Sequence, residues 1–194
     1  MKMKKILAAL LLVASASAFG QQKWTVDPSH SGVRFTVMHI MVSEVEGRFT
    51  KFNGTIDAPW PNFVNAKISF TVDVNSINTD DDIRNEHLKS DDFFNAGKYP
   101  NMTFTSTSFR KVKDNKYALE GNLTIRDVTK KVKFDVTYLG KAKSQRGTVA
   151  GFKATAIIDR LAYGLKWNAL ADAGGSIVGK DVTISLNLEF VETK

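Results

Sequence analysis

The histidines are the first residues to test for chemistry, because imidazole can act as a general base or hold a metal ion. The chain has three of them, His30, His39 and His87, and they share no metal-ligand spacing such as i, i+4 on one helix. His30 and Ser31 are adjacent in a predicted strand or turn, so their side chains diverge and cannot pair as base and nucleophile. Histidines scattered in this way are typical of structural roles.

Other reactive groups are equally sparse. The acidic run at residues 80–82 lacks the alternating acids and central glycine of a calcium loop, so helix capping is the expected role. The chain contains no cysteine, which excludes disulfides, thiolate nucleophiles, Cys-type zinc sites and iron–sulfur clusters. No Gly-rich phosphate loop and no nucleophile elbow is present. We therefore expect no catalytic residue, no metal and no cofactor.

The first 18 residues have the pattern of a targeting segment. A basic start at residues 1–5 precedes an apolar run, Ile6 to Val13, and a small-x-small site at residues 16–18. The run is too short for a bilayer core of about 30 Å, so we expect a secretory signal peptide cleaved after Ala18 and one domain at residues 19–194. Cleavage lowers the net charge from +7 by three lysines to +4, a weak bias that favours no nucleic-acid partner.

Apolar and polar residues alternate with a period of two along most of the remaining chain. Such alternation is typical of strands with one buried face and one wet face. Turn-forming residues separate the runs at 113–116, 140–147 and 174–175. Roughly eight strands at this spacing predict an all-β antiparallel barrel or sandwich. The runs are residues 66–74, 131–138, 152–159 and 182–190, with weaker ones at 33–37, 48–56, 102–109 and 117–125.

One segment, at about residues 79–96, breaks the alternation and predicts a short helical insertion. Thr79 is placed to cap a helix whose first turn carries acids, and Pro100 closes the insertion before the next strand. Residues 90–94 predict a second capped turn. A helical insertion between the strands of a barrel can serve as a plug or lid.

The chain resembles the YceI family of exported, lipocalin-like, polyisoprenoid-binding proteins. The similarity is collinear over nearly the whole chain after residue 23. It is carried by residues 24–31, Phe35, His39, 47–49, 52–54, 76–79, 84–94, 99–100, 103–104, 121–125, 151–152, Arg160 and Gly164. The family pattern is broken at Asn85, Asp127, Ala162 and Tyr163. These departures leave the barrel untouched but could alter the mouth of a pocket.

The resemblance implies an eight-stranded antiparallel lipocalin-like barrel in the periplasm, with a long apolar cavity. It also implies a carrier or store of a long-chain isoprenoid or acyl lipid, such as an isoprenoid quinone or a fatty-acid derivative. The expected partner is that lipid, with no membrane-spanning segment and a possible homodimer.

The candidate ligand-binding residues come from strand parity and from the insertion. Those expected to point inward from strands are Phe35, Phe49, Ile68, Phe70, Val72, Phe104, Leu123, Phe134, Val136 and Phe152. In the insertion, Ile83, Leu88, Phe93 and Phe94 are expected to close or line the cavity, with Arg84 and His87 nearest a polar head group. The alternative is that Arg84 pairs with an acid such as Asp92 and that His87 is a structural hydrogen-bonder.

Three function classes remain open at this point. The first is the lipid carrier. The second is a small outer-membrane barrel, which would invert the alternation and place Lys131 and Lys133 inside and Phe134 outside. The third is an enzyme acting on a lipid in the cavity, using His87 or Arg84. An eight-stranded barrel can also be filled by its own side chains, so the phenylalanines could simply be core.

Overall fold

The computed structural model describes residues 20–59, 62–170 and 174–193, so the expected signal peptide lies outside the described residues. The strands are β1 (Gln21–Val26), β2 (Gly32–His39), β3 (Ser43–Phe49), β4 (Phe52–Pro59), β5 (Lys67–Asp73), β6 (Ile77–Asn78), β7 (Asn101–Lys113), β8 (Lys116–Ile125), β9 (Val128–Ser144), β10 (Gly147–Asp159) and β11 (Val178–Thr193). The one α-helix of these residues is α1 (Asp82–Lys89), and short 3₁₀ turns are η1 (Pro28–His30), η2 (Val74–Ser76) and η3 (Leu161–Tyr163).

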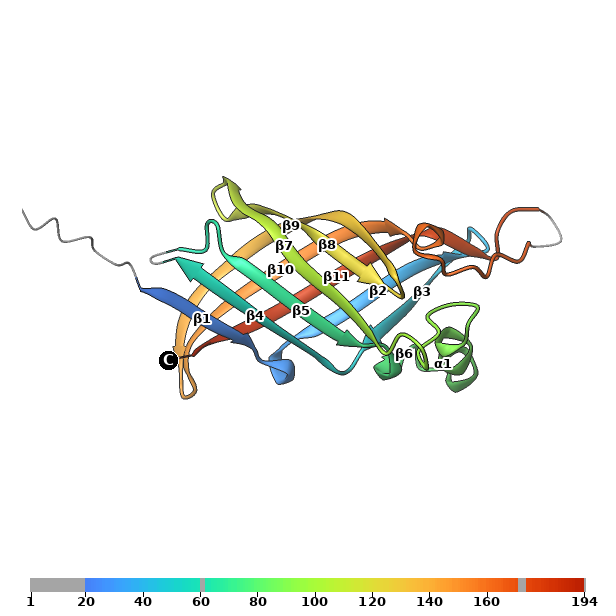
Figure 1. Ribbon diagram of the computed structural model, residues 1–194, viewed down its shortest axis with the longest axis horizontal. Helices are drawn as coiled ribbons and strands as arrows, with labels where there is room; N and C mark the ends of the chain where they lie inside the picture. The colour runs from blue at the N-terminus through green and yellow to red at the C-terminus, as the bar shows by residue number, and fades with distance from the viewer. Residues whose placement is uncertain (1–19, 60–61, 171–173, 194) are drawn as a thin grey trace, which may run out of the picture.

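The strands close into an antiparallel barrel, as the alternation and the family resemblance predict (Figure 1). The closed ring runs β1-β4-β5-β7-β8-β9-β10-β11 and returns to β1, which makes eight strands. The four longest strands, β7, β9, β10 and β11, come from the second half of the chain and form one continuous wall with β8. Closure leaves this ring without free edges.

At two positions around the barrel, the strand is interrupted in the middle. β11 pairs with β2 through its first half and with β1 through its last residues, so β1 and β2 form one split strand along β11. β3 and β4 form a second split strand beside them. The single strand expected at residues 48–56 is therefore wrong. The chain bends at Thr50 and Lys51, whose backbone amides donate to the Ser76 carbonyl and to Ser76 Oγ at 3.1 and 3.0 Å.

The helical insertion forms where it was predicted, but its cap differs. Asp81, not Thr79, is the N-cap, and its side chain accepts from the Arg84 amide at 2.9 Å. Asp80 has a left-handed backbone with φ of 58°, which turns the chain after Thr79 and delays the start of the helix. Thr79 Oγ1 instead donates to Asn85 Oδ1 at 2.8 Å. The helix lies at one end of the barrel, next to β6 (Figure 1).

The apolar side chains of the alternating runs face inward, as expected for a barrel with an apolar interior. In β9, Phe134 is buried while Lys131 and Lys133 are exposed. The inverted arrangement that the outer-membrane alternative requires is therefore not found in this strand. Among the described residues, no helix is long and apolar enough to cross a membrane.

Candidate functional site: an apolar cavity closed by a pinned turn

The barrel encloses a cavity of about 190 Å³. Its wall is almost entirely apolar. The polar residues that contribute to the lining are Arg34, Thr103 and Arg160. A cavity of about 150 Å³ lined by Leu, Ile and Phe stays dry and binds small apolar molecules. The space in this barrel is therefore suited to hydrocarbon and unsuited to a polar group.

The predicted inward positions all line this cavity, along with three residues of the insertion. The predicted residues that line it are Phe35, Phe49, Ile68, Phe70, Val72, Leu88, Phe93, Phe94, Phe104, Leu123, Phe134, Val136 and Phe152. Whether they contact a ligand stays a prediction. The candidate set had left out the lining of β11, namely Val178, Val182, Ile184, Leu186, Leu188 and Phe190. Strict alternation from Val182 to Phe190 was the signal that could have added most of these residues.

One prediction for the insertion, the placement of Ile83, is wrong, and a head-group contact of Arg84 and His87 stays a prediction, although neither residue lines the cavity. Ile83 is 86% exposed and lies away from the cavity. Arg84 does not reach the cavity either, because its guanidinium donates to Thr79 Oγ1 and to the Thr79 carbonyl, both at 2.8 Å, and lies 3.7 Å from Asp81. His87 Nε2 contacts Asp92 Oδ2 at 3.0 Å. The alternative of structural roles for Arg84 and His87 fits these contacts, although the acid beside Arg84 is Asp81 rather than Asp92.

Arg126 anchors the turn that closes the cavity. Arg126 lies in the short turn between β8 and β9, yet its side chain is only 8% exposed. Its Nη1 donates to the carbonyls of Asp91, Phe93 and Gly164 at 2.8–3.0 Å, and its Nη2 donates to Asp91 Oδ1 at 2.7 Å. One guanidinium thus ties the 90–94 turn to the segment after β10. The same ion pair contributes to the lowered pKa of the Asp91 carboxyl, after the larger effect of the Asn95 hydrogen bond.

Phe93 is held from the other side by an aromatic cluster. Its ring stacks on Trp167 at 5.8 Å and meets His87 edge-on at 5.1 Å. The Trp167 amide donates to the Asp92 carbonyl at 3.0 Å. Phe93 and Phe94 are therefore placed against the cavity by contacts that close around the turn, and the lid is part of the packed structure.

Arg160 is buried beside the same turn. It is 3% exposed, and its guanidinium donates to the backbone carbonyls of Leu165, Trp167, Val178 and Gly179 at 2.7–3.1 Å. Burial lowers the pKa of this guanidinium. Because these carbonyls take up its donors and the cavity wall beside it is apolar, Arg160 clamps the chain between β10 and β11 and offers no polar surface to a ligand.

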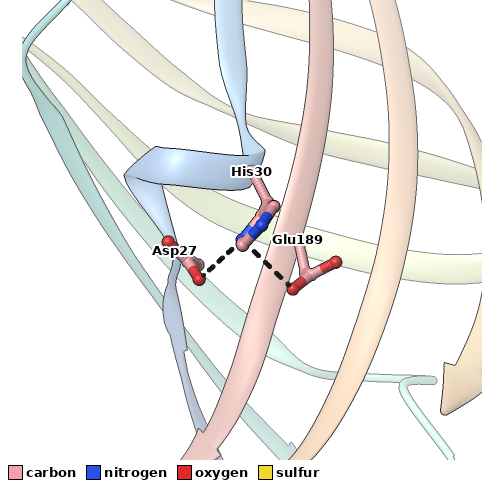
Figure 2. Close-up of side chains that lie close together, drawn as sticks. All are labelled: Asp27, His30 and Glu189. Atoms are coloured by element: carbon pink, nitrogen blue, oxygen red, sulfur yellow. Dashed lines mark hydrogen bonds and ion pairs between the residues drawn. The ribbon is translucent and has the colours of Figure 1, made fainter. Parts of the chain in front are cut away.

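A second polar cluster lies where β1 breaks into β2 (Figure 2). The buried Asp27 carboxylate caps η1 and accepts from the Ser29 amide at 2.9 Å and from Ser29 Oγ at 2.5 Å. His30 Nδ1 lies 3.0 Å from Asp27 Oδ2 and 3.8 Å from Glu189 Oε1, and Arg146 Nη1 donates to Asp27 at 2.8 Å. The hydrogen bonds from Ser29 and His30, with the charge of Arg146, hold the pKa of Asp27 far below its usual range.

This cluster is best explained as a latch on the split strand. The ligand atoms of Asp27, His30 and Glu189 lie within 4.8 Å of one another, which is close enough to surround a cation. The Asp27 carboxylate, however, already accepts from a hydroxyl, an amide and a guanidinium. The Asp27 amide also donates to the Glu189 carbonyl at 2.8 Å. These contacts join β1, β11 and the β9–β10 turn.

The positions that depart from the family pattern do not line the cavity. Asn85 accepts from the amide and the hydroxyl of Thr79 at 2.8 Å, and Asp127 accepts from Tyr99 Oη at 2.9 Å. Tyr163 is buried, and burial raises its pKa to about 12. Whether they alter the mouth of the pocket stays a prediction.

Comparison with known proteins agrees with this architecture. A UPF0312 protein of Staphylococcus aureus (strain bovine RF122) is 36% identical over 169 residues, which are 86% of this chain and 96% of that protein. The structure of Burkholderia cenocepacia BcnA superposes with a TM-score of 0.74 at 26% identity, covering 84% of this chain and 98% of BcnA. The Campylobacter jejuni YceI protein gives a TM-score of 0.67 at 31% identity, covering 81% and 90%.

A polyisoprenoid-binding domain of Saccharophagus degradans shares the fold, with a TM-score of 0.65 at 17% identity over 88% of this chain and 98% of that domain. The family model described as the YceI-like domain matches residues 24–190. With that match spanning nearly the whole barrel, the chain belongs to the YceI-like family.

Proposed function

We propose that this protein is an exported, periplasmic binding protein that carries one long-chain lipid with its tail inside the barrel. The observation that carries the proposal is the cavity inside the barrel, whose wall is almost entirely apolar. Removing apolar surface from water lowers the free energy in proportion to the area buried, so such a wall selects hydrocarbon. The shared fold of the polyisoprenoid-binding domain of S. degradans is consistent with an isoprenoid tail, and an acyl tail meets the same requirement.

The head group of the ligand should remain at the mouth of the barrel. Burying a polar group without a hydrogen-bond partner is costly, and the interior wall offers almost no polar atom. Arg160 cannot serve as a head-group site, because backbone carbonyls already hold its donors. Recognition should therefore depend on the tail and only loosely on the head.

Binding accounts for this interior better than catalysis does. Acid–base or nucleophilic chemistry needs a titratable or nucleophilic group within reach of the substrate. The described lining residues include no carboxylate, imidazole or serine. The two residues considered for catalysis, Arg84 and His87, lie outside the cavity.

Export rests on the pattern of residues 1–18. Cell fractionation with intact-mass measurement tests it, since cleavage after Ala18 gives a chain that begins at Phe19. A cytoplasmic protein of uncleaved mass would contradict the periplasmic assignment without affecting the lipid-binding assignment.

Native mass spectrometry of the purified protein, followed by extraction, tests the lipid-binding proposal. We expect one long-chain lipid per barrel. The variant Ala154→Phe adds a ring to the cavity wall and should lose this lipid while remaining folded. Its matched control is Ile157→Phe, which adds the same ring on the outer face of the same strand at a residue that is 70% exposed. Retention of the lipid by a folded Ala154→Phe variant would contradict the proposal.

A further inference from the structure

The turn between β2 and β3 presents three consecutive large apolar side chains to solvent. Ile40, Met41 and Val42 are 43%, 74% and 82% exposed. Single exposed apolar residues are common on soluble proteins, but a contiguous apolar tip marks an interaction surface. We call residues 40–42 the apolar tip.

The backbone conformation of the apolar tip is one that favours Asn and Gly over the residues present. Ile40 and Met41 both have left-handed backbones, with φ of 48° and 60°, and the Val42 amide donates to the His39 carbonyl at 3.1 Å. Two successive positive φ angles define the type I′ turn, for which Asn-Gly is strongly preferred. A β-branched residue in this region is an outlier. The turn therefore holds apolar side chains at a conformational cost, and such strain is concentrated at functional sites.

The apolar tip adjoins the end of the cavity. The Ile40 amide donates to the Ile177 carbonyl at 2.9 Å, and His39 pairs with Val178, which lines the cavity. The Ile177 amide in turn donates to the Ala169 carbonyl at 3.0 Å, next to Leu170, which is 69% exposed. Figure 1 shows this turn, α1 and the segment after β10 gathered at one end of the barrel.

We propose that the apolar tip, together with Leu170, inserts into the surface of a lipid bilayer and docks the barrel there for transfer of a lipid tail. The inference rests on the proposed function, because a long-chain lipid resides in a bilayer and must leave it to enter the cavity. Because His39, which precedes the tip, pairs with the cavity-lining Val178, the tip would bring this end of the cavity to the bilayer.

The size and charge of the tip favour a bilayer over other occupants. A stable dimer needs about 800 Å² per partner, far more than a three-residue turn supplies. The tip carries no Lys or Arg, and the nearest fixed charge along β3 is the acid Glu44. Docking should therefore depend on apolar insertion, with little dependence on salt or on anionic lipid.

The test is flotation of the purified protein with phosphatidylcholine vesicles, with intact mass used to confirm that all proteins start at the same residue. The double variant Ile40→Asn/Met41→Gly gives the turn the Asn-Gly sequence that its backbone conformation prefers. It should raise the melting temperature and lower partition to vesicles about tenfold or more. The control is Val112→Thr, a 60% exposed apolar position near the β7–β8 turn at the other end of the barrel, and it should leave partition unchanged.

Flotation and light scattering distinguish bilayer docking from its alternatives. Equal flotation of wild type and double variant, or no flotation of either, would overturn bilayer docking. A tip-dependent dimer in light scattering, without flotation, would also overturn it and assign the surface to a second copy. Loading of the wild type from detergent-solubilised lipid separates the two proposals. If only bilayer docking is wrong, the wild type still takes up the lipid. If lipid binding is wrong, it takes up none.

Discussion

Phe70 lies directly on the backbone of Gly54, its cross-strand partner between β4 and β5. A Cβ at position 54 would come within 2.2 Å of Phe70 Cδ2. The rings of Phe35 and Phe104 lie in the same way on Gly47 and Gly121. Because a glycine lies beneath each of these rings, the three phenylalanines rest against the barrel wall and leave the centre of the barrel open.

Gly54→Ala should therefore reduce the cavity. The added methyl cannot be accommodated unless the Phe70 ring moves, and we expect a loss of about 1–3 kcal/mol in the free energy of unfolding with weaker binding of long tails. Denaturant unfolding and lipid titration measure the two effects. The control is Gly97→Ala, where nothing lies within 4 Å of the added Cβ. Equal behaviour of the two variants would mean that the contact between Phe70 and Gly54 does not shape the cavity.

Arg126→Met should loosen the lid. The substitution leaves the carbonyls of Asp91, Phe93 and Gly164 without their donor, which should cost about 2–3 kcal/mol of stability. Because the Phe93 turn is then held from one side only, bound lipid should dissociate faster. The control is Arg110→Met, which removes an exposed guanidinium 3.6 Å from Glu120 and should change stability by less than about 1 kcal/mol. Unchanged dissociation in a folded Arg126→Met variant would show that the turn does not gate the cavity.

The Asp27 latch should make the protein less stable in acid. Because the pKa of Asp27 is lowered in the folded state, its contribution to stability is complete above the ordinary aspartate pKa of about 4. Below that pH the Asp27 carboxyl is protonated in the unfolded chain but stays ionised in the folded one, so stability falls as the pH falls. Unfolding curves at pH 7, 4 and 3 should show this loss for wild type and a smaller pH dependence for Asp27→Asn. Asp114→Asn, in the β7–β8 turn, is the control and should follow wild type.

Period-two alternation predicted the barrel interior because strand parity alone decides which side chains face inward. Phe134 and Lys133 differ by one residue and lie on opposite faces. The same logic cannot orient a short helix, whose buried side depends on how it docks, and Ile83 was misplaced for that reason. Arg126 was missed because its partners at Asp91 and Gly164 are 35 and 38 residues away along the chain. Those contacts exist only after the barrel has closed.

Titration of the emptied protein with a series of single-chain lipids that differ only in tail length is the most direct test of the central claim. Each buried methylene contributes about 0.8 kcal/mol, so a tail of about ten carbons gains roughly 8 kcal/mol against an association cost of about 4–15 kcal/mol. A tail of about twenty carbons gains roughly 16 kcal/mol only if the lining side chains move apart to admit it, because a cavity of about 190 Å³ is close to the size of about 150 Å³ that holds one benzene molecule. We expect affinity to rise steeply with tail length and to change little with the head group. Equal affinity for short and long tails would mean that side chains fill the barrel, and the carrier function would be contradicted.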